Sequence, residues 1–128
     1  MSAHDGLIEQ MMVTARDCIT HDVLRSVNAV IQLKVDTGDA GVQNFFINLK
    51  NDGGSVERGQ WSHGPVALTV DLKAEDIRRL LSDEQYYLEA FLTGRVRLDV
   101  KDGEVMGRLE PFIKEFKGLF QATLASLE

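Results

Sequence analysis

Alternation of apolar and polar residues with a period of two recurs at several places between Val27 and Val100. Four segments show it: VNAVIQLKV from Val27, NFFINLK from Asn44, ALTVDL from Ala67 and RVRLDV from Arg95. A period of two places successive side chains on opposite faces, so each segment predicts a strand with one apolar face. Strands of this kind are typical of a largely antiparallel sheet whose other face is in water.

The remaining apolar residues are spaced for helices that would cover the apolar face. Residues 5–19 carry one apolar stripe, and residues 74–84 and 86–93 carry shorter ones. A last stripe repeats every four residues, and Pro111 is expected to start or kink its helix; it consists of Phe112, Phe116, Phe120 and Leu124. Residues 20–26 read as a polar connection.

The order of these elements predicts an α+β fold. A further short strand, SVERG at residues 55–59, brings the sheet to five strands. We expect a two-layer, mostly antiparallel five-stranded sheet with one face covered by helices. A chain of 128 residues is expected to form a single domain, 1–128.

Charge and hydropathy exclude several classes of partner. The chain has 14 basic and 20 acidic residues and a net charge of −6, which argues against nucleic acid as a partner. No apolar run approaches the ~20 residues of a membrane span, and no basic segment precedes an apolar one near the N-terminus. We therefore expect a cytoplasmic protein without a membrane span.

Residues with catalytic or metal-binding chemistry are sparse. The three histidines, His4, His21 and His63, lack ligand spacing, and no nucleophile-elbow, zinc-protease, P-loop or dinucleotide-binding motif occurs. We expect no catalytic residue, no metal site and no cofactor, and hence a protein that is not an enzyme. Cys18 stands alone at helical spacing from Ala15, which favours a buried small apolar residue over a reactive thiol.

Two segments make the chain resemble a known family. They are the turn Lys50–Gly54 and the pair Ala90-Phe91 followed by Gly94-Arg95-Val96-Arg97. Together with ALTVDL leading into AEDIRRLL, and with EVMGRLEPF, they resemble the sterol carrier protein (non-specific lipid-transfer) domain from about Val27 to Phe116. The resemblance implies an apolar tunnel between sheet and helices that binds a fatty acid, sterol, acyl-CoA or other lipid without chemistry.

The resemblance also implies which residues line the tunnel. Its floor would be formed by Ile31, Leu33, Phe45, Ile47, Val70, Leu72 and Leu98. Its wall would be formed by Ile77, Leu81, Phe91 and Leu92, and its far side by Met106, Leu109, Ile113 and Phe116. Phe120 joins the predicted lipid-binding set. Independently of the resemblance, the apolar stripe that continues past Gly118 predicts that the residues after Gly118 form a movable lid or a docking segment, anchored by Phe120 and Leu124.

Departures from the family leave the ligand and the role open. The chain ends in Ala-Ser-Leu-Glu instead of a peroxisomal address, which favours a bacterial-type stand-alone member. An isoprenoid is then as credible a ligand as a sterol. The alternative function is a scaffold or interaction module with a solid core, which assists a lipid- or quinone-metabolising enzyme. The oligomeric state stays unknown at this stage.

Overall fold

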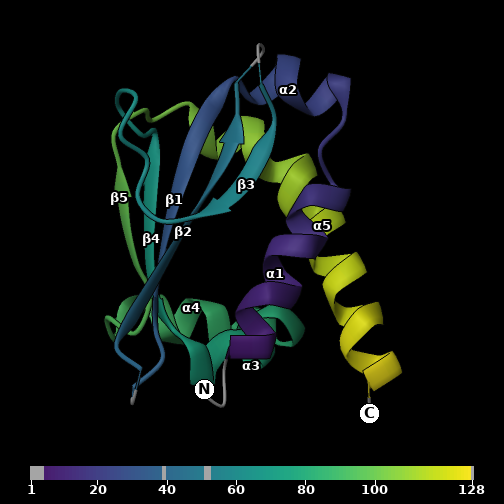
Figure 1. The fold of residues 1–128 in the computed structure, drawn as a ribbon. Coiled ribbons are helices and arrows are strands. Elements are labelled where there is room, and N and C mark those ends of the chain that lie inside the picture. Colours follow the sequence, from purple (N-terminus) through teal and green to yellow (C-terminus); the bar gives the residue numbers. More distant parts are fainter. Residues whose placement is uncertain (1–4, 39, 51–52, 128) are drawn as a thin grey trace.

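A computed structural model describes residues 5–38, 40–50 and 53–127 of the chain. Among these residues one sheet is covered by helices on one side (Figure 1). The strands are β1 (Ala29–Asp36), β2 (Val42–Leu49), β3 (Ser55–Arg58), β4 (Leu68–Lys73) and β5 (Arg97–Val100). The helices are α1 (Asp5–Asp17), α2 (His21–Val27), the 3-10 turn η1 (Ala74–Asp76), α3 (Ile77–Ser82), α4 (Glu84–Leu92) and α5 (Val105–Leu127).

The strands lie in the order β3-β2-β1-β4-β5. All neighbours are antiparallel except β1 and β4, which run parallel because the chain crosses from β3 back over the sheet. The predicted α+β class with a mostly antiparallel five-stranded sheet is confirmed. In Figure 1, α1 and α5 lie side by side over one face, and α3 and α4 lie at the lower end of the sheet.

The predicted connection at residues 20–26 is wrong, because residues 21–27 form helix α2. Thr20 caps this helix through its hydroxyl, which accepts a hydrogen bond from the Val23 amide at 3.2 Å. At the other end Asn28 adopts the left-handed conformation, with φ of 44°, and ends the helix before β1. A helix of two turns carries too little periodicity to be recognised, although its cap residues were visible.

The turn after β2 brings the backbone close to the helices. Gly54 has a φ of +112°, and a side chain on it would lie 3.2 Å from Ile19 and 3.3 Å from Leu24. Glycine is required here on both counts. Asn51 and Asp52 of the predicted turn lie outside the described residues.

The second face of the sheet is only partly in water, contrary to the prediction. The loop between β3 and β4 covers one half, where Gln32 is 4% and Phe46 9% exposed. The Gln32 amide donates to the carbonyl oxygens of Phe45 at 3.1 Å and Gly59 at 3.0 Å, and it accepts from the Trp61 amide at 2.8 Å. A polar residue of an alternating strand is thus buried because a loop satisfies its hydrogen bonds.

Helix α5 runs without a break through Pro111 and Gly118, so Pro111 does not start it. Phe120 is fully buried, and its ring stacks on that of Phe116 with centroids 5.6 Å apart. The helix therefore belongs to the core at least as far as Phe120. The side chain of Leu124 lies outside the described part, and opening of the segment after Gly118 stays a prediction.

Candidate functional site

The layer between sheet and helices is hollow at the end that carries α3 and α4. A cavity of about 480 Å³ opens there, within the range of roughly 300–1,000 Å³ that small-molecule sites occupy. Strand, helix and loop residues contribute to its lining, which consists of Met11, Leu33, Leu68, Val70, Leu72, Leu80, Leu81, Tyr87, Val96, Leu98, Met106, Ile113, Phe116 and Lys117. Almost every one of these side chains is apolar.

A smaller cavity of about 140 Å³ adjoins the larger one. Both are lined by Met11, Leu33, Leu68, Val70, Ile113 and Phe116. The smaller cavity extends toward Ile31, Phe45 and Ile47 on β1 and β2, and toward Leu109 and Phe112 on α5. The two cavities are therefore neighbouring parts of one apolar space.

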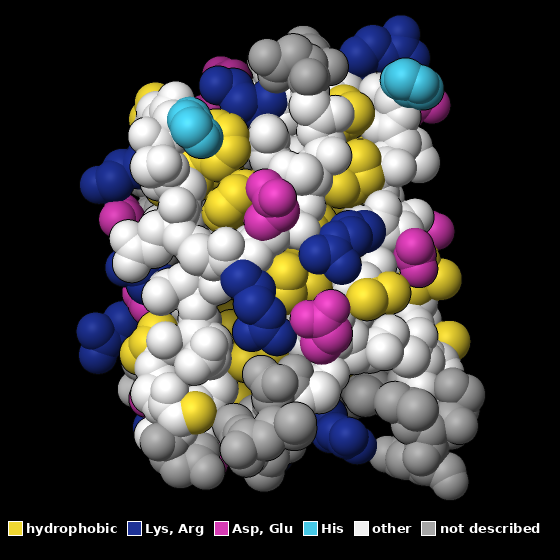
Figure 2. Space-filling view, in the orientation of Figure 1, with side chains coloured by type: hydrophobic (Ala, Val, Ile, Leu, Met, Phe, Trp, Pro, Cys, Tyr) yellow, Lys and Arg dark blue, Asp and Glu magenta, His cyan; other side chains and the backbone are white. Residues whose placement is uncertain are grey.

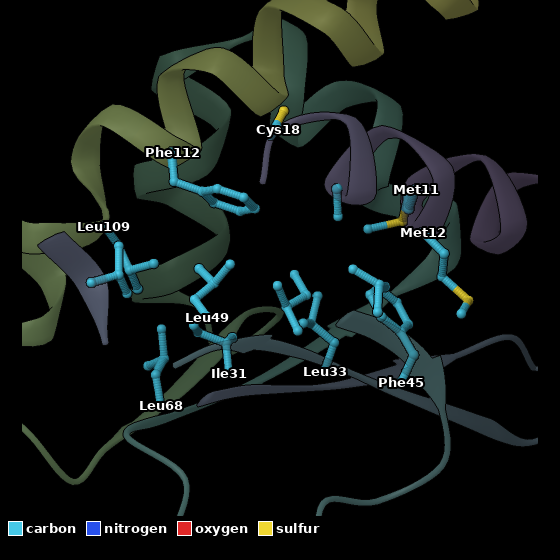
Figure 3. Close-up of a cluster of buried hydrophobic side chains, with 14 of the residues drawn as sticks. Met11, Met12, Cys18, Ile31, Leu33, Phe45, Leu49, Leu68, Leu109 and Phe112 are labelled. Atoms are coloured by element: carbon cyan, nitrogen blue, oxygen red, sulfur yellow. The ribbon is translucent and has the colours of Figure 1, made fainter. Parts of the chain in front are cut away.

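Strand register aligns the floor of this space. Phe45 pairs with Leu33, Leu33 with Val70, and Val70 with Leu98, so one apolar row crosses β2, β1, β4 and β5. Partners in register share a face of the sheet, and here that face is the helical one. Figure 3 shows Leu33 and Phe45 pointing from the sheet toward the helices, with Phe45 beneath Met11 and Met12. Phe45 is fully buried, whereas Val70 and Leu98 stay partly accessible although they face the helices.

The mouth of the larger cavity lies between α4 and α5. Tyr87 of α4 and Ile113 of α5 both line the cavity and are 43% and 40% exposed. Lys117 lies one turn beyond Ile113 on the same helix and is half-buried. Residues that line a cavity and also reach solvent mark its opening.

Most of the side chains proposed from the sequence as tunnel lining border one of the two cavities. They are Ile31, Leu33, Phe45, Ile47, Val70, Leu72, Leu81, Leu98, Met106, Leu109, Ile113 and Phe116. The structure thus brings these residues together, and contact of a lipid with them stays a prediction. Ile77 and Phe120 are buried but line neither cavity.

The predicted position of Phe91 and Leu92 in the wall is wrong. Phe91 is 46% and Leu92 74% exposed, and neither lines a cavity. Helix α4 instead turns Tyr86 and Ala90 inward, where they are 8% and 0% exposed. They pack in a small cluster with Val96 and Leu80 that borders the larger cavity.

A buried polar network orients α4. The Tyr86 hydroxyl donates to Asp76 Oδ1 at 2.8 Å, and Arg95 donates to both oxygens of Asp76, through Nε at 2.9 Å and Nη2 at 3.0 Å. Burial alone would raise the pKa of Asp76, but the hydrogen bonds from Arg95 and Tyr86 prevail and lower it. The bond to Asp76 raises the pKa of Tyr86. This charge-assisted network ties Tyr86 inward, so Phe91 and Leu92 face outward.

Several lining residues were missed by sequence reasoning. They are Met11, Leu68, Leu80, Tyr87, Val96, Phe112 and Lys117. For Leu68 and Val96 a signal existed, because they share the alternation of Val70 and Leu98 within their segments. No pattern in the sequence indicated Lys117 as a lining residue, since a helical lysine is ordinarily solvated.

Reactive groups are scarce in the part of the chain that the structure describes. No cluster of three or more His, Cys, Asp or Glu side chains suited to a metal ion occurs there. Cys18 is 3% exposed, and burial, together with the nearby charges of Glu115 and Asp17, raises the pKa of its thiol to about 11. A thiol with so high a pKa stays protonated at neutral pH, as expected for a packing residue.

The surface carries charged side chains of both signs. On the face shown in Figure 2, Lys and Arg side chains are interspersed with Asp and Glu side chains. No helix in the described ranges 5–38, 40–50 and 53–127 has the length and apolar character needed to cross a membrane.

Comparison with protein families identifies the fold. The family model described as "SCP-2 sterol transfer family" matches residues 8–114, most of the chain. The chain belongs to this family. Domains of the SCP-2 family generally bind lipids and catalyse no reaction. The predicted resemblance to the sterol carrier protein domain is thereby confirmed.

Individual relatives are more distant. Hydroxysteroid dehydrogenase-like protein 2 of Rattus norvegicus is 26% identical over 95 residues, which are 74% of this chain and 18% of that protein. The chain therefore spans about a fifth of the length of this relative. The sterol carrier protein domain 2 of Helicoverpa armigera superposes with a TM-score of 0.70 at 17% identity, covering 92% of this chain and 94% of that one. Palmitated SCP2L2 of Aedes aegypti gives a TM-score of 0.58 at 24% identity, covering 88% and 95%.

Proposed function

We propose that the protein binds and carries a single-chain lipid in the cavity between sheet and helices, without chemical conversion. The observation that carries this proposal is the larger cavity, about 480 Å³ in volume and lined almost wholly by apolar side chains. Membership of the SCP-2 family supports it, as does the palmitated state of the Aedes aegypti relative. A fatty acid, a sterol-like molecule and an isoprenoid chain share the apolar body that such a lining accepts.

Burial of the chain supplies the affinity. Each methylene removed from water contributes about 0.8 kcal/mol, so about fifteen methylenes contribute about 12 kcal/mol. Loss of translational and rotational freedom takes back at least about 4 kcal/mol. The remaining ~8 kcal/mol corresponds to a dissociation constant near 1 μM. We therefore expect a long-chain fatty acid to bind with a dissociation constant of about 1 μM or above.

Native mass spectrometry of protein purified without added lipid tests the proposal. We expect a bound species that organic solvent releases and lipid analysis identifies, at close to one molecule per chain. Protein stripped of lipid should then bind a fluorescent fatty acid with the same stoichiometry. If neither a co-purifying lipid nor fatty acid binding is found, the lipid-carrier proposal is wrong and the scaffold function takes its place.

The scaffold function has one observation in its favour. Helix α4 presents an apolar face to solvent, with Leu88 58%, Phe91 46% and Leu92 74% exposed. Exposed apolar patches mark surfaces that contact other molecules. In Hydroxysteroid dehydrogenase-like protein 2 the matching region is a small part of a larger chain, so a partner enzyme is a reasonable second candidate. Co-purification of such an enzyme, lost on changing Leu88 and Leu92 to glutamine, would favour this function.

A further inference from the structure

Two side chains with hydrogen-bond donors stand out in the apolar lining of the larger cavity. Among the lining residues whose side chains the structure describes, only Tyr87 and Lys117 carry an O–H or N–H group, and only Lys117 is charged. Both lie at the mouth, because Tyr87 is 43% exposed and Lys117 is half-buried. An otherwise apolar pocket with a few polar groups at one end orients an amphipathic ligand.

The position of Lys117 follows from its neighbours on α5. Ile113, four residues earlier, lines the cavity, and Gln121, four residues later, donates a side-chain hydrogen bond to the Leu81 carbonyl of α3. Residues four apart lie on one face of a helix, so Lys117 lies on the face of α5 that carries Ile113 and Gln121 and that packs against α3. A lysine there packs its methylene stem on the apolar wall while its ammonium group stays at the opening.

The charge of Lys117 is uncompensated in the part of the chain that the structure describes. Its side chain makes no ion pair or hydrogen bond there, and the lining residues described there include no carboxylate. The Tyr87 hydroxyl likewise makes no hydrogen bond among the described residues. Polar groups beside an apolar wall are favourable when a partner satisfies them. An anionic group at the end of a bound acyl chain would be such a partner for both.

We propose that Lys117 makes the cavity selective for single-chain lipids with a carboxylate head, in preference to neutral lipids of equal length. The carboxylate accepts from the Lys117 ammonium group, and the Tyr87 hydroxyl is a second donor. The inference rests on the proposed lipid-binding function. It concerns a residue that lies beyond positions 8–114, the range that the family model matches.

Titration with parinaric acid and with its alcohol tests the inference at pH 7.4, where the acid is ionised. The two probes share the same fluorescent chain and differ only at the head. A partly exposed charge pair strengthened by hydrogen bonds predicts a roughly three- to tenfold preference of the wild-type protein for the acid. Lys117→Gln should abolish that preference by weakening the acid alone, and Lys117→Arg should retain it.

Lys114→Gln is the matched control, because Lys114 lies on the same helix, is exposed and lines neither cavity. This variant loses the same charge and should keep the preference for the acid. Equal binding of acid and alcohol by the wild-type protein, or an unchanged preference in Lys117→Gln, overturns the inference while lipid binding itself stands. Failure of both probes to bind the wild-type protein overturns the lipid-binding function, and the role of Lys117 falls with it.

Discussion

Substitution of Val70 by phenylalanine distinguishes a hollow layer from a solid core. Val70 lies in the middle of β4 between Leu33 and Leu98, and it lines both cavities. The larger ring adds four carbon atoms to a space of about 480 Å³. Because that space is available, we expect the free energy of unfolding to stay within about 0.5 kcal/mol of the wild-type value or to rise by up to ~2 kcal/mol. In a filled core the same change lowers it by about 1–3 kcal/mol.

Val70→Phe should lower the affinity for lipid. The added ring occupies the volume of up to about four methylenes of the ligand, which is a loss of about 3 kcal/mol or roughly a hundredfold in affinity. Urea denaturation of lipid-free protein and titration with a fluorescent fatty acid measure the two effects.

Val35→Phe is the matched control for this experiment. Val35 lies on the neighbouring strand β1, belongs to the buried core, is 0% exposed and lines neither cavity. Its substitution should lower the free energy of unfolding by about 1–3 kcal/mol. Equal destabilisation by Val70→Phe and Val35→Phe would refute the hollow layer, because both positions would then be equally filled.

Three further outcomes follow from the structure. Asp76→Asn should lower the free energy of unfolding at pH 7 by about 2 kcal/mol, since it weakens the bonds from Arg95 and Tyr86. Folding lowers the pKa of Asp76, so its carboxylate contributes to the free energy of unfolding in full above the unfolded pKa of about 3.9. This contribution is lost as the pH falls from there through the lower folded pKa. The free energy of unfolding of Asp76→Asn should therefore fall less with decreasing pH than that of the wild-type protein. The side chain of Phe91 is 46% exposed, so Phe91→Ala should lower the free energy of unfolding by less than the ~3–5 kcal/mol expected for a buried phenylalanine. The affinity for fatty acid should stay unchanged, and a reduced affinity would show that Phe91 contacts the lipid after all. In hydrogen exchange, amides after Gly118 should exchange faster in lipid-free protein than in the complex, and equal rates would exclude a lid.

The floor of the cavity was predictable from the sequence because a strand allows few alternatives. Once Leu33, Val70 and Leu98 are assigned to alternating segments, a shift of one residue would turn each apolar set toward water. The pairing of strands then places these residues in one row. Local periodicity thus determined which side chains face the helices.

The orientation of α4 was not predictable in this way. Apolar residues occupy more than one of its faces, so Tyr86 and Ala90 compete with Phe91 and Leu92 for the inward position. The choice depends on the hydrogen bond from Tyr86 to Asp76, a partner ten residues away on another element. Contacts of this kind depend on the tertiary structure, and spacing within the helix does not reveal them.

The covered half of the second sheet face escaped prediction for a similar reason. Gln32 reads as a solvent-facing residue of an alternating strand, and only the path of the loop that carries Trp61 shows how its amide is satisfied. The role of Lys117 at the cavity mouth also depends on how α5 packs against α3. Loop paths and helix packing are therefore the parts that required the structure.

Intermolecular nuclear Overhauser effects between carbon-13-labelled palmitate and the protein's methyl groups test the central claim most directly. If the lipid occupies the larger cavity, its methylenes should show contacts to methyl groups of Leu33, Leu72, Leu98 and Met106, all of which line that space. Val35, in the closed core beside it, should show none and serves as the internal control. Contacts confined to the outer face of α4, at Leu88 and Leu92, or no contacts at all, would contradict a lipid held between sheet and helices.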